Sequence, residues 1–250
     1  MTAVLQNKEA LITGGTTGIG LAAAKAMIEE GADVIITGQN TERVNIAVAD
    51  LGPKAFGMTA ASQDAETPAR IAKAVTDRFG SLDILFANAG VSWPAPLGRI
   101  DASAVVQQMT INFVGPLMMM QALRPLLNRG ASVFFTTSNL DRMGMPGLAV
   151  YSASKAALRC LSRTLAAELI GEGVRVNTIA PGPIETPLLG KLGLSKEDLS
   201  GMKEDIRSAV PLGRFGKPEE IAAAAVFLAS DASSYMLGEE ITIDGGRCNL

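Results

Sequence analysis

The amino-acid sequence predicts an α/β fold in which a parallel sheet is covered by helices on both faces. Short apolar runs alternate with amphipathic helical stretches along the chain. The short runs are continuously apolar, as in DVIIT at residues 33–37 and LDILFA at 82–87. Strands buried on both faces have this pattern, which is typical of parallel sheets between helices. We therefore expect a doubly wound sheet of the Rossmann type.

Seven apolar runs mark the expected strands, and six helical stretches connect them. The strands are expected at 9–13, 33–37, 55–60, 82–87, 132–138, 175–180 and 239–244. The helices are expected at 18–31, 41–52, 66–80, 103–128, 151–170 and 218–230. No linker, repeat or low-complexity stretch interrupts the alternation, so residues 1–250 are predicted to form one domain.

One segment, at about 186–216, breaks this alternation, because glycines interrupt its short helical pieces. A long insertion after a strand end is often a lid or a substrate loop. We predict a substrate loop here, with a plain surface excursion as the alternative.

The composition argues against several classes of function. The net charge is −3 with both signs dispersed, so nothing favours nucleic acid as a partner. The chain has no histidine and two cysteines, which argues against Ser-His-Asp hydrolysis and against a metal site. Cys160 is expected in the core. We find no leader sequence and no run long enough to span a bilayer, so we expect a cytoplasmic protein without a membrane partner.

A glycine-rich turn, TGGTTGIG at residues 13–20, lies between the first expected strand and the first expected helix. Glycines permit a tight turn and close backbone approach, and the N-terminus of the following helix attracts phosphate charge. A purely structural turn is the alternative. We predict that the turn binds the pyrophosphate of a dinucleotide through Gly14, Thr16, Thr17, Gly18, Ile19 and Gly20.

The end of the second expected strand indicates which dinucleotide binds. An acid there would bind the adenine-ribose hydroxyls and repel a 2′-phosphate. Gly38 and Gln39 occupy this place instead, and Asn40 and Arg43 follow as donors for a phosphate. We predict a narrow preference for NADP(H) over NAD(H).

Tyr151 and Lys155 are four positions apart in an expected helix and so share one face. A nearby cation stabilises phenolate and lowers the pKa of a tyrosine. Ser138 ends the fifth expected strand, where α/β sheets bind their ligands. The phenol can then exchange protons in place of the absent imidazole. An exposed helical pair and a turn-forming serine are the alternatives.

Together these motifs resemble those of the short-chain dehydrogenase/reductase family, in order and in spacing, over nearly the whole chain. The resemblance implies a parallel sheet in the order 3-2-1-4-5-6-7 and a homotetramer or homodimer. The matching segments are TGGTTGIG, NAG at 88–90, TINFVG around Asn112, Ser138, YSASK at 151–155, PGPIET at 181–186 and DGG at 244–246.

The resemblance also implies catalytic roles. Tyr151 would be the general acid/base, and Lys155 would lower its pKa and bind the nicotinamide ribose. Ser138 would position the substrate oxygen. Asn112 would hold a water of the proton relay, within a local irregularity of its helix.

The implied cofactor contacts lie after the third, fourth and sixth expected strands. The family usually has an aspartate and an apolar residue for adenine, but Ala61 and Ser62 stand at that place here. The other implied contacts are Asn88, Ala89 and Gly90, and Pro181, Gly182, Ile184 and Thr186.

The predicted function is an NAD(P)(H)-dependent oxidoreductase that interconverts a secondary alcohol and a ketone. A 3-oxoacyl-[acyl-carrier-protein] reductase is the alternative enzyme, and a dinucleotide sensor without turnover is the alternative outside enzymes. We expect no arginine or lysine for a substrate carboxylate. Mostly apolar candidates favour a substrate with apolar substituents, and these are Trp93, Leu140, Met143, Met145, Leu188 and Leu189.

Overall fold

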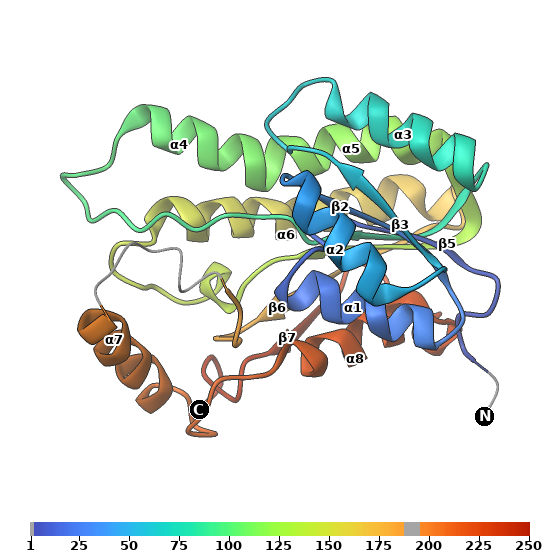
Figure 1. Ribbon diagram of the computed structural model, residues 1–250. Coiled ribbons are helices and arrows are strands. Elements are labelled where there is room, and N and C mark those ends of the chain that lie inside the picture. Colours follow the sequence, from blue (N-terminus) through green and yellow to red (C-terminus); the bar gives the residue numbers. More distant parts are fainter. Residues whose placement is uncertain (1–2, 188–195) are drawn as a thin grey trace.

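Seven parallel strands form one sheet in the computed structural model, in the order β3-β2-β1-β4-β5-β6-β7 (Figure 1). The structure describes residues 3–187 and 196–250. Both the number of strands and their order were predicted from the sequence and are confirmed. The strands are β1 (Glu9–Ile12), β2 (Asp33–Gly38), β3 (Ala55–Thr59), β4 (Leu82–Ala87), β5 (Leu127–Thr136), β6 (Arg175–Pro181) and β7 (Glu240–Ile243).

Helices cover both faces of the sheet. Figure 1 shows α3, α4, α5 and α6 on one side of it and α1 and α8 on the other. None of the helices described is both long and apolar enough to cross a membrane. Their bounds are α1 (Gly18–Glu29), α2 (Thr41–Leu51), α3 (Thr67–Arg78), α4 (Ala102–Met109), α5 (Gly115–Leu123), α6 (Ala149–Leu169), α7 (Lys196–Ser208) and α8 (Pro218–Ala229).

Each central strand supplies side chains to two separate cores. Ala10 and Ile12 of β1 belong to the cluster beneath α1 and α8, whereas Leu11 belongs to the cluster beneath α3, α5 and α6. Successive side chains of a strand point to opposite faces, so a sheet covered twice needs apolar residues at every position. This explains why the strands read as continuous apolar runs.

The long helix expected at 103–128 is divided in the structure. A π-helical turn, Thr110–Val114, separates α4 from α5, and a short 3₁₀ turn, Arg124–Leu126, ends the element. β5 then begins at Leu127, earlier than expected, because Leu127 pairs with Leu82 before a shift in register. The π turn is the local irregularity expected around Asn112.

The expectation that Cys160 lies in the core is wrong. Its thiol is exposed, because α6 buries a different stripe of residues at helical spacing, which includes Leu158, Ser162 and Ala166.

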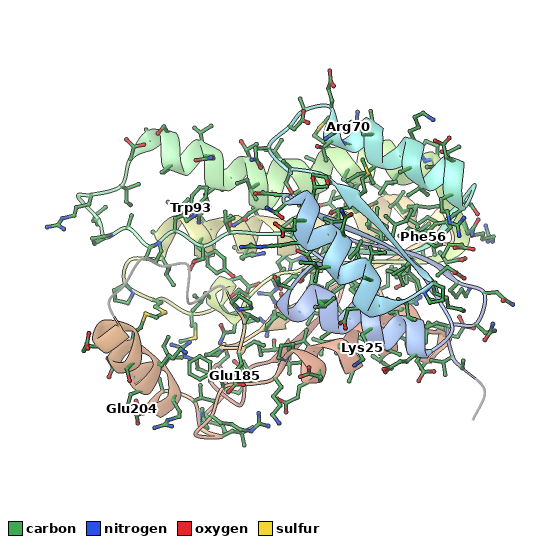
Figure 2. All side chains as sticks on the ribbon, viewed as in Figure 1. Lys25, Phe56, Arg70, Trp93, Glu185 and Glu204 are labelled. Carbon is green, nitrogen blue, oxygen red and sulfur yellow. The ribbon has the colours of Figure 1, made fainter. Side chains whose placement is uncertain are left out.

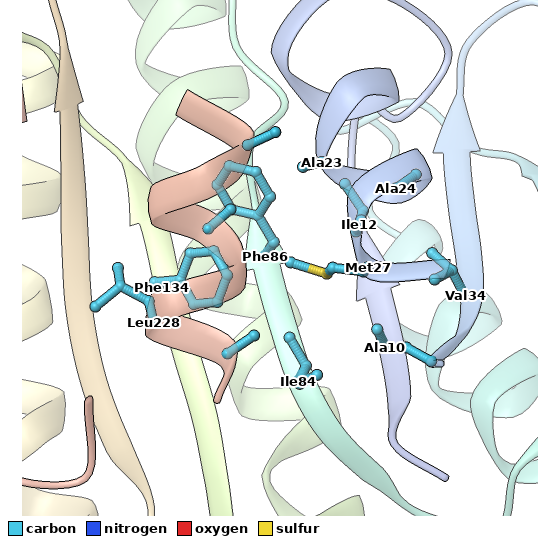
Figure 3. Close-up of a cluster of buried hydrophobic side chains, with 14 of the residues drawn as sticks. Ala10, Ile12, Ala23, Ala24, Met27, Val34, Ile84, Phe86, Phe134 and Leu228 are labelled. Atoms are coloured by element: carbon cyan, nitrogen blue, oxygen red, sulfur yellow. The ribbon is translucent and has the colours of Figure 1, made fainter. Parts of the chain in front are cut away.

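Two aromatic rings stack at the centre of the core beneath α8. The Phe86 and Phe134 centroids lie 4.7 Å apart, and both side chains are fully buried (Figure 3). Replacing Phe134 with alanine removes this contact and leaves a cavity, so we expect the free energy of unfolding to fall by about 3–5 kcal/mol. Urea denaturation measures it.

The matched control is Leu97→Ala, at a side chain that is 95% exposed. Its free energy of unfolding should stay within about 0.5 kcal/mol of the wild type. Equal losses in the two variants would contradict this account of the core.

Candidate active site

A cavity of about 700 Å³ lies at the carboxyl ends of the strands. Residues that follow β1, β2, β4, β5 and β6 all line it. In a doubly wound sheet this edge, where the strand order reverses between β1 and β4, is where ligands bind. The volume is that of a pocket for a cofactor or a drug-sized molecule.

The glycine turn after β1 has the backbone shape that its sequence requires. Gly14 and Gly18 have φ angles of +65° and +55°, which residues with a Cβ rarely adopt. A Cβ on Gly20 would lie 2.3 Å from the Gly14 carbonyl oxygen. Gly20 therefore lets α1 pack against the turn, and it does not line the cavity.

Most of the predicted cofactor residues surround this one cavity. Two predicted cofactor residues, Gly20 and Ala61, do not line the cavity. Ala60 lines it in place of Ala61, and the Ala60 N–H donates to the Gly38 carbonyl at the end of β2. The predicted residues that line the cavity are Gly14, Thr16, Thr17, Gly18, Ile19, Gly38, Gln39, Ser62, Asn88, Ala89, Gly90, Tyr151, Lys155, Pro181, Gly182, Ile184 and Thr186.

Asn88 joins the ends of three neighbouring strands. Its side-chain amide donates to the Thr13 carbonyl at 3.1 Å, and its side-chain oxygen accepts from the Thr136 hydroxyl at 3.0 Å. The Thr13 hydroxyl in turn accepts from the backbone N–H groups of Asn88 and Ala89. These bonds fix the floor of the cavity.

Asn112 lies behind the cavity wall, fully buried in the π turn. Its side chain accepts from the Val91 N–H and donates to the Val91 carbonyl, both at 2.9 Å, and donates to the Ser154 hydroxyl at 3.0 Å. Val91 lines the cavity, but Asn112 does not. In this structure Asn112 therefore holds the segment after β4 against α6.

Ser138, Tyr151 and Lys155 all line the cavity. The Lys155 ammonium donates to the Thr136 carbonyl at 2.7 Å and lies 5.8 Å from the centre of the Tyr151 ring. Burial lowers the pKa of Lys155 to about 8. The helix thus presents the phenol and the amine to one space, as their spacing predicted.

The pKa of Tyr151 differs from the expectation. Burial raises it, the hydrogen bond to Ser138 opposes that rise, and the charge of Asp141 adds to it. The neighbour that lowers the pKa in this structure is Ser138 rather than Lys155. The reason is that both groups are desolvated and the ammonium is bound to a strand carbonyl.

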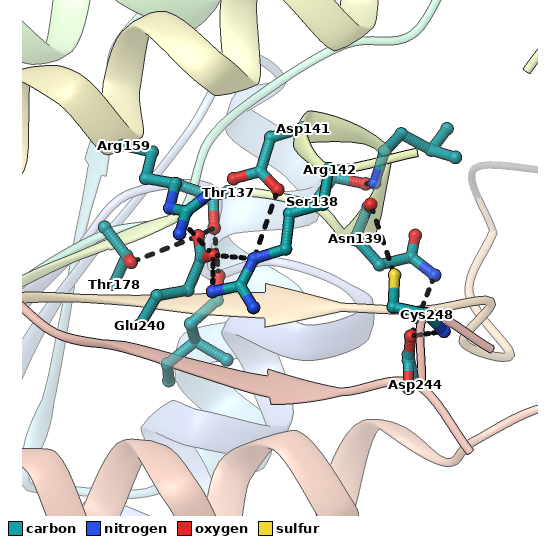
Figure 4. Close-up of polar contacts among 12 residues, drawn as sticks. Thr137, Ser138, Asn139, Asp141, Arg142, Arg159, Thr178, Glu240, Asp244 and Cys248 are labelled. Carbon is teal, nitrogen blue, oxygen red and sulfur yellow. Dashed lines mark hydrogen bonds and ion pairs between the residues drawn. The ribbon is translucent and has the colours of Figure 1, made fainter. Parts of the chain in front are cut away.

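A buried acid pair lies beside Ser138 (Figure 4). The side chains of Asp141 and Glu240 are 0% and 3% exposed, and Arg142 and Arg159 form ion pairs with Glu240. Burial and the adjacent Glu240 carboxylate raise the pKa of Asp141 to about 7. Arg142 forms an ion pair with Asp141 at 3.9 Å, but no described group donates a hydrogen bond to the Asp141 carboxylate. Burial and Glu240 therefore outweigh the arginine charges and favour the protonated form.

The predicted substrate residues divide into three groups. Leu140 and Met145 line the cavity. Trp93, in the loop after β4 (Figure 2), and Met143 do not line the cavity. Trp93 is 38% exposed, and its backbone N–H donates to the Gln108 side-chain oxygen at 3.1 Å. Leu188 and Leu189 lie outside the described residues.

Several residues that were not predicted also line the cavity. Leu148, Ile206 of α7 and Phe215 extend its apolar wall. Arg247, which follows the DGG of the last strand, lines it too, although the predicted substrate residues include no arginine or lysine. Its signal in the sequence was a cation directly after a pair of glycines at the end of β7.

The charges around the cavity have one sign. Arg43, Lys155 and Arg247 line it, whereas no aspartate or glutamate does so within residues 3–187 and 196–250. A cavity lined by cations and by no described acid favours anionic ligands.

The acid pair predicts how stability depends on pH. Between about pH 4 and pH 7 folded Asp141 keeps a proton that the unfolded chain has released, so stability falls as pH rises through this window. Asp141→Asn removes this titration. As pH rises across this window, we expect the free energy of unfolding of the variant to increase relative to that of the wild type, by up to about 1.4 kcal/mol per pH unit. Urea denaturation at each pH measures this difference.

The control is Asp77→Asn, which changes an exposed acid paired with Lys73. Its stability should run parallel to that of the wild type across the same pH range. A constant difference between Asp141→Asn and the wild type would show that Asp141 does not hold a proton at neutral pH.

Comparisons with known proteins bear on this site. The family model described as enoyl-(acyl carrier protein) reductase matches residues 14–247. The oxidoreductase asL5 of Sarocladium schorii is 41% identical over 98% of both chains. Galactitol 2-dehydrogenase of Agrobacterium fabrum is 35% identical, and the 3-oxoacyl-[acyl-carrier-protein] reductase FabG of Thermotoga maritima is 36% identical, each over 97% of this chain and 98% of the relative.

Solved structures agree with these relatives. A dehydrogenase/reductase from Sinorhizobium meliloti superposes with a TM-score of 0.91 at 32% identity, over 100% of this chain and 98% of that one. The fold, the glycine turn after β1 and the cavity at the strand ends are those of an enzyme that binds NAD(P). The chain belongs to the short-chain dehydrogenase/reductase family of oxidoreductases.

Proposed function

We propose that this oxidoreductase interconverts a secondary alcohol and a ketone with an NAD(P)(H) cofactor. The observation that carries the proposal is that Ser138, Tyr151 and Lys155 line the same cavity as the glycine turn. A proton donor, a positioning hydroxyl and a dinucleotide site in one space are what such a reaction requires.

The cavity residues fit a dinucleotide. Gly14 and Gly18 of the turn line the cavity with positive φ angles, and a Cβ at Gly90 would approach the Lys155 amine to 3.2 Å. The turn would hold the pyrophosphate, Lys155 the nicotinamide ribose, and Ile184 and Thr186 the carboxamide. When bound, the dinucleotide supplies or accepts the hydride.

In this proposal the protein positions the substrate oxygen and moves one proton. The Ser138 hydroxyl donates a hydrogen bond to that oxygen, and Tyr151 exchanges a proton with it. Because burial raises the pKa of Tyr151, the phenol stays protonated at neutral pH and is ready to donate during ketone reduction. In alcohol oxidation the same group must first lose its proton, so oxidation is favoured at higher pH.

We propose NADP(H) as the preferred cofactor. Gln39, Asn40 and Arg43 line the cavity at the end of β2, and no described acid lines it there to repel a 2′-phosphate. The Arg43 side chain forms no ion pair among the described residues, so its charge is available to a phosphate.

A 3-oxoacyl-[acyl-carrier-protein] reductase is the second candidate. The relatives from Thermotoga maritima and Chlamydia muridarum bear this name, at 36% and 35% identity. Other relatives are named for alcohols without a carrier, such as galactitol and cis-4-hydroxycyclohexanecarboxylate. Turnover of an acyl thioester on the carrier protein, well above turnover of simple ketones, would favour the second candidate.

We also propose that residues 186–216 cover the substrate. The two ends of this segment meet, since Glu185 N–H donates to the Gly216 carbonyl and Gly216 N–H to the Pro183 carbonyl, both at 2.9 Å. Ile206 and Phe215 from the segment line the cavity.

We further propose that the chain forms one domain, assembles as a homotetramer or homodimer and is located in the cytoplasm. Val114 and Met118, which are 42% and 41% exposed, offer an apolar surface for the assembly.

Replacing Tyr151 with phenylalanine tests the proton transfer. The ring stays and the hydroxyl is lost, so we expect kcat for ketone reduction to fall by about 10²- to 10⁴-fold. The dissociation constant of NADPH, measured by its fluorescence, should change little. The absorbance of reduced nicotinamide measures turnover.

The chain offers a matched control, because its other tyrosine, Tyr235, is fully exposed. Tyr235→Phe should turn over like the wild type. Unchanged turnover in Tyr151→Phe would remove Tyr151 from the mechanism.

Replacing Arg43 with alanine tests the cofactor preference. If the guanidinium meets the 2′-phosphate, kcat/KM for NADPH should fall by about tenfold while kcat/KM for NADH stays the same, because a charge-assisted hydrogen bond is lost. A wild-type enzyme that strongly prefers NADH would overturn the assignment.

A further inference from the structure

Arg247 lies in the C-terminal segment that follows β7, on a turn that carries it to the cavity. Gly245 and Gly246, directly before it, have φ angles of +67° and +89°. Residues other than glycine rarely adopt these backbone φ angles. Arg247 lines the cavity together with Met145 and Leu148, which are between Ser138 and Tyr151 in the sequence.

The backbone on both sides of Arg247 is anchored. The Asp244 carboxylate accepts hydrogen bonds from the N–H groups of Gly246 and Cys248, at 3.0 and 2.9 Å. It also accepts one from the Asn139 side chain at 3.3 Å (Figure 4). Asn139 follows Ser138 directly, so Arg247 is fixed relative to the loop that carries the positioning serine.

The Arg247 guanidinium lacks an anionic partner among the described residues. Its Nε is buried and without a hydrogen-bond acceptor. One terminal nitrogen lies 4.0 Å from the Met145 sulfur, which is a weak acceptor. The neighbouring Asp244 carboxylate is already bound to Asn139 and to the backbone. A partly buried guanidinium without an acceptor costs free energy that an anionic ligand would offset.

The place of Arg247 in the fold separates it from the cofactor phosphates. The glycine turn follows β1 and Arg43 follows β2, whereas Arg247 follows β7 at the opposite edge of the sheet. Ser138 follows β5, and its loop is bonded to the Arg247 segment. Arg247 thus belongs to the substrate end of the cavity.

We propose that Arg247 binds a carboxylate of the substrate, so that the enzyme acts on hydroxy acids and oxo acids. The planar guanidinium forms paired hydrogen bonds with a carboxylate. Leu140, Met145 and Leu148 contact the carbon chain between that carboxylate and the oxygen held by Ser138 and Tyr151. The inference rests on the proposed function, since it names the substrate class of the same site.

Matched pairs of substrates test the proposal. Levulinate and its next two higher homologues are each compared with their methyl esters, in the wild type, Arg247→Met and Arg247→Lys. We expect the wild type to favour at least one acid over its ester by about 10- to 100-fold in kcat/KM, the worth of a charge-assisted hydrogen bond. Arg247→Met should lose this preference through KM, and Arg247→Lys should keep part of it.

The matched control is Arg99→Met, which makes the same change at an exposed arginine that does not line the cavity. It should keep the preference of the wild type. Turnover of the esters by Arg247→Met shows that this variant is folded. The proposal would be overturned if the ratio of kcat/KM for the acid to kcat/KM for its ester were the same in the wild type and in Arg247→Met.

A binding measurement separates this proposal from the proposed function. The protein loaded with oxidised cofactor cannot reduce an oxo acid, so calorimetric titration with each acid reports binding alone. We expect Arg247→Met to raise the dissociation constants of the acids by about 10- to 100-fold and to leave those of the esters unchanged. If the acids bind through Arg247 but are not turned over, the proposed alcohol–ketone reaction is wrong and the proposed carboxylate site stands. Acids that bind the wild type no better than their esters, or an Arg247→Met variant that loses the cofactor instead, would refute the site.

Discussion

A continuous line of hydrogen bonds across the strand ends holds the whole site together. It runs from Thr13 after β1, through Asn88 after β4 and Thr136 at the end of β5, to the Lys155 ammonium on α6. Each bond links elements that are distant in sequence and adjacent in the sheet. The glycine turn and α6 are therefore joined through one set of hydrogen bonds, whose geometry follows from the order of the strands.

Burial decides how the groups of this site titrate. The Tyr151 phenol and the Lys155 amine are both kept neutral more readily than in water, because the cavity wall removes their hydration. Asp141 responds to the same desolvation and to the adjacent Glu240 by retaining a proton to about pH 7. The titration of Tyr151, Lys155 and Asp141 is thus set by burial in each case.

The charges that remain divide the cavity into regions with different tasks. Arg43 lies at the β2 end, Lys155 in the middle beside Tyr151, and Arg247 at the β7 end, with no described acid in the lining. This order agrees with the phosphate, the ribose and the substrate carboxylate that we propose for these three cations. Selectivity for ligands then comes from where each cation stands rather than from net charge, which is only −3.

The sequence by itself predicted a parallel sheet between helices and the shared face of Tyr151 and Lys155, because apolar periodicity and helical spacing are local properties. The strand order followed from the family resemblance of its motifs. The sequence could not decide which side of the wall Asn112 and Trp93 would occupy, nor that Lys155 would be bound to a strand carbonyl, since these depend on packing between distant elements. Arg247 shows the difference most clearly. Its two preceding glycines are visible in the sequence, but only the tertiary fold brings the segment after β7 to the cavity that Ser138 lines.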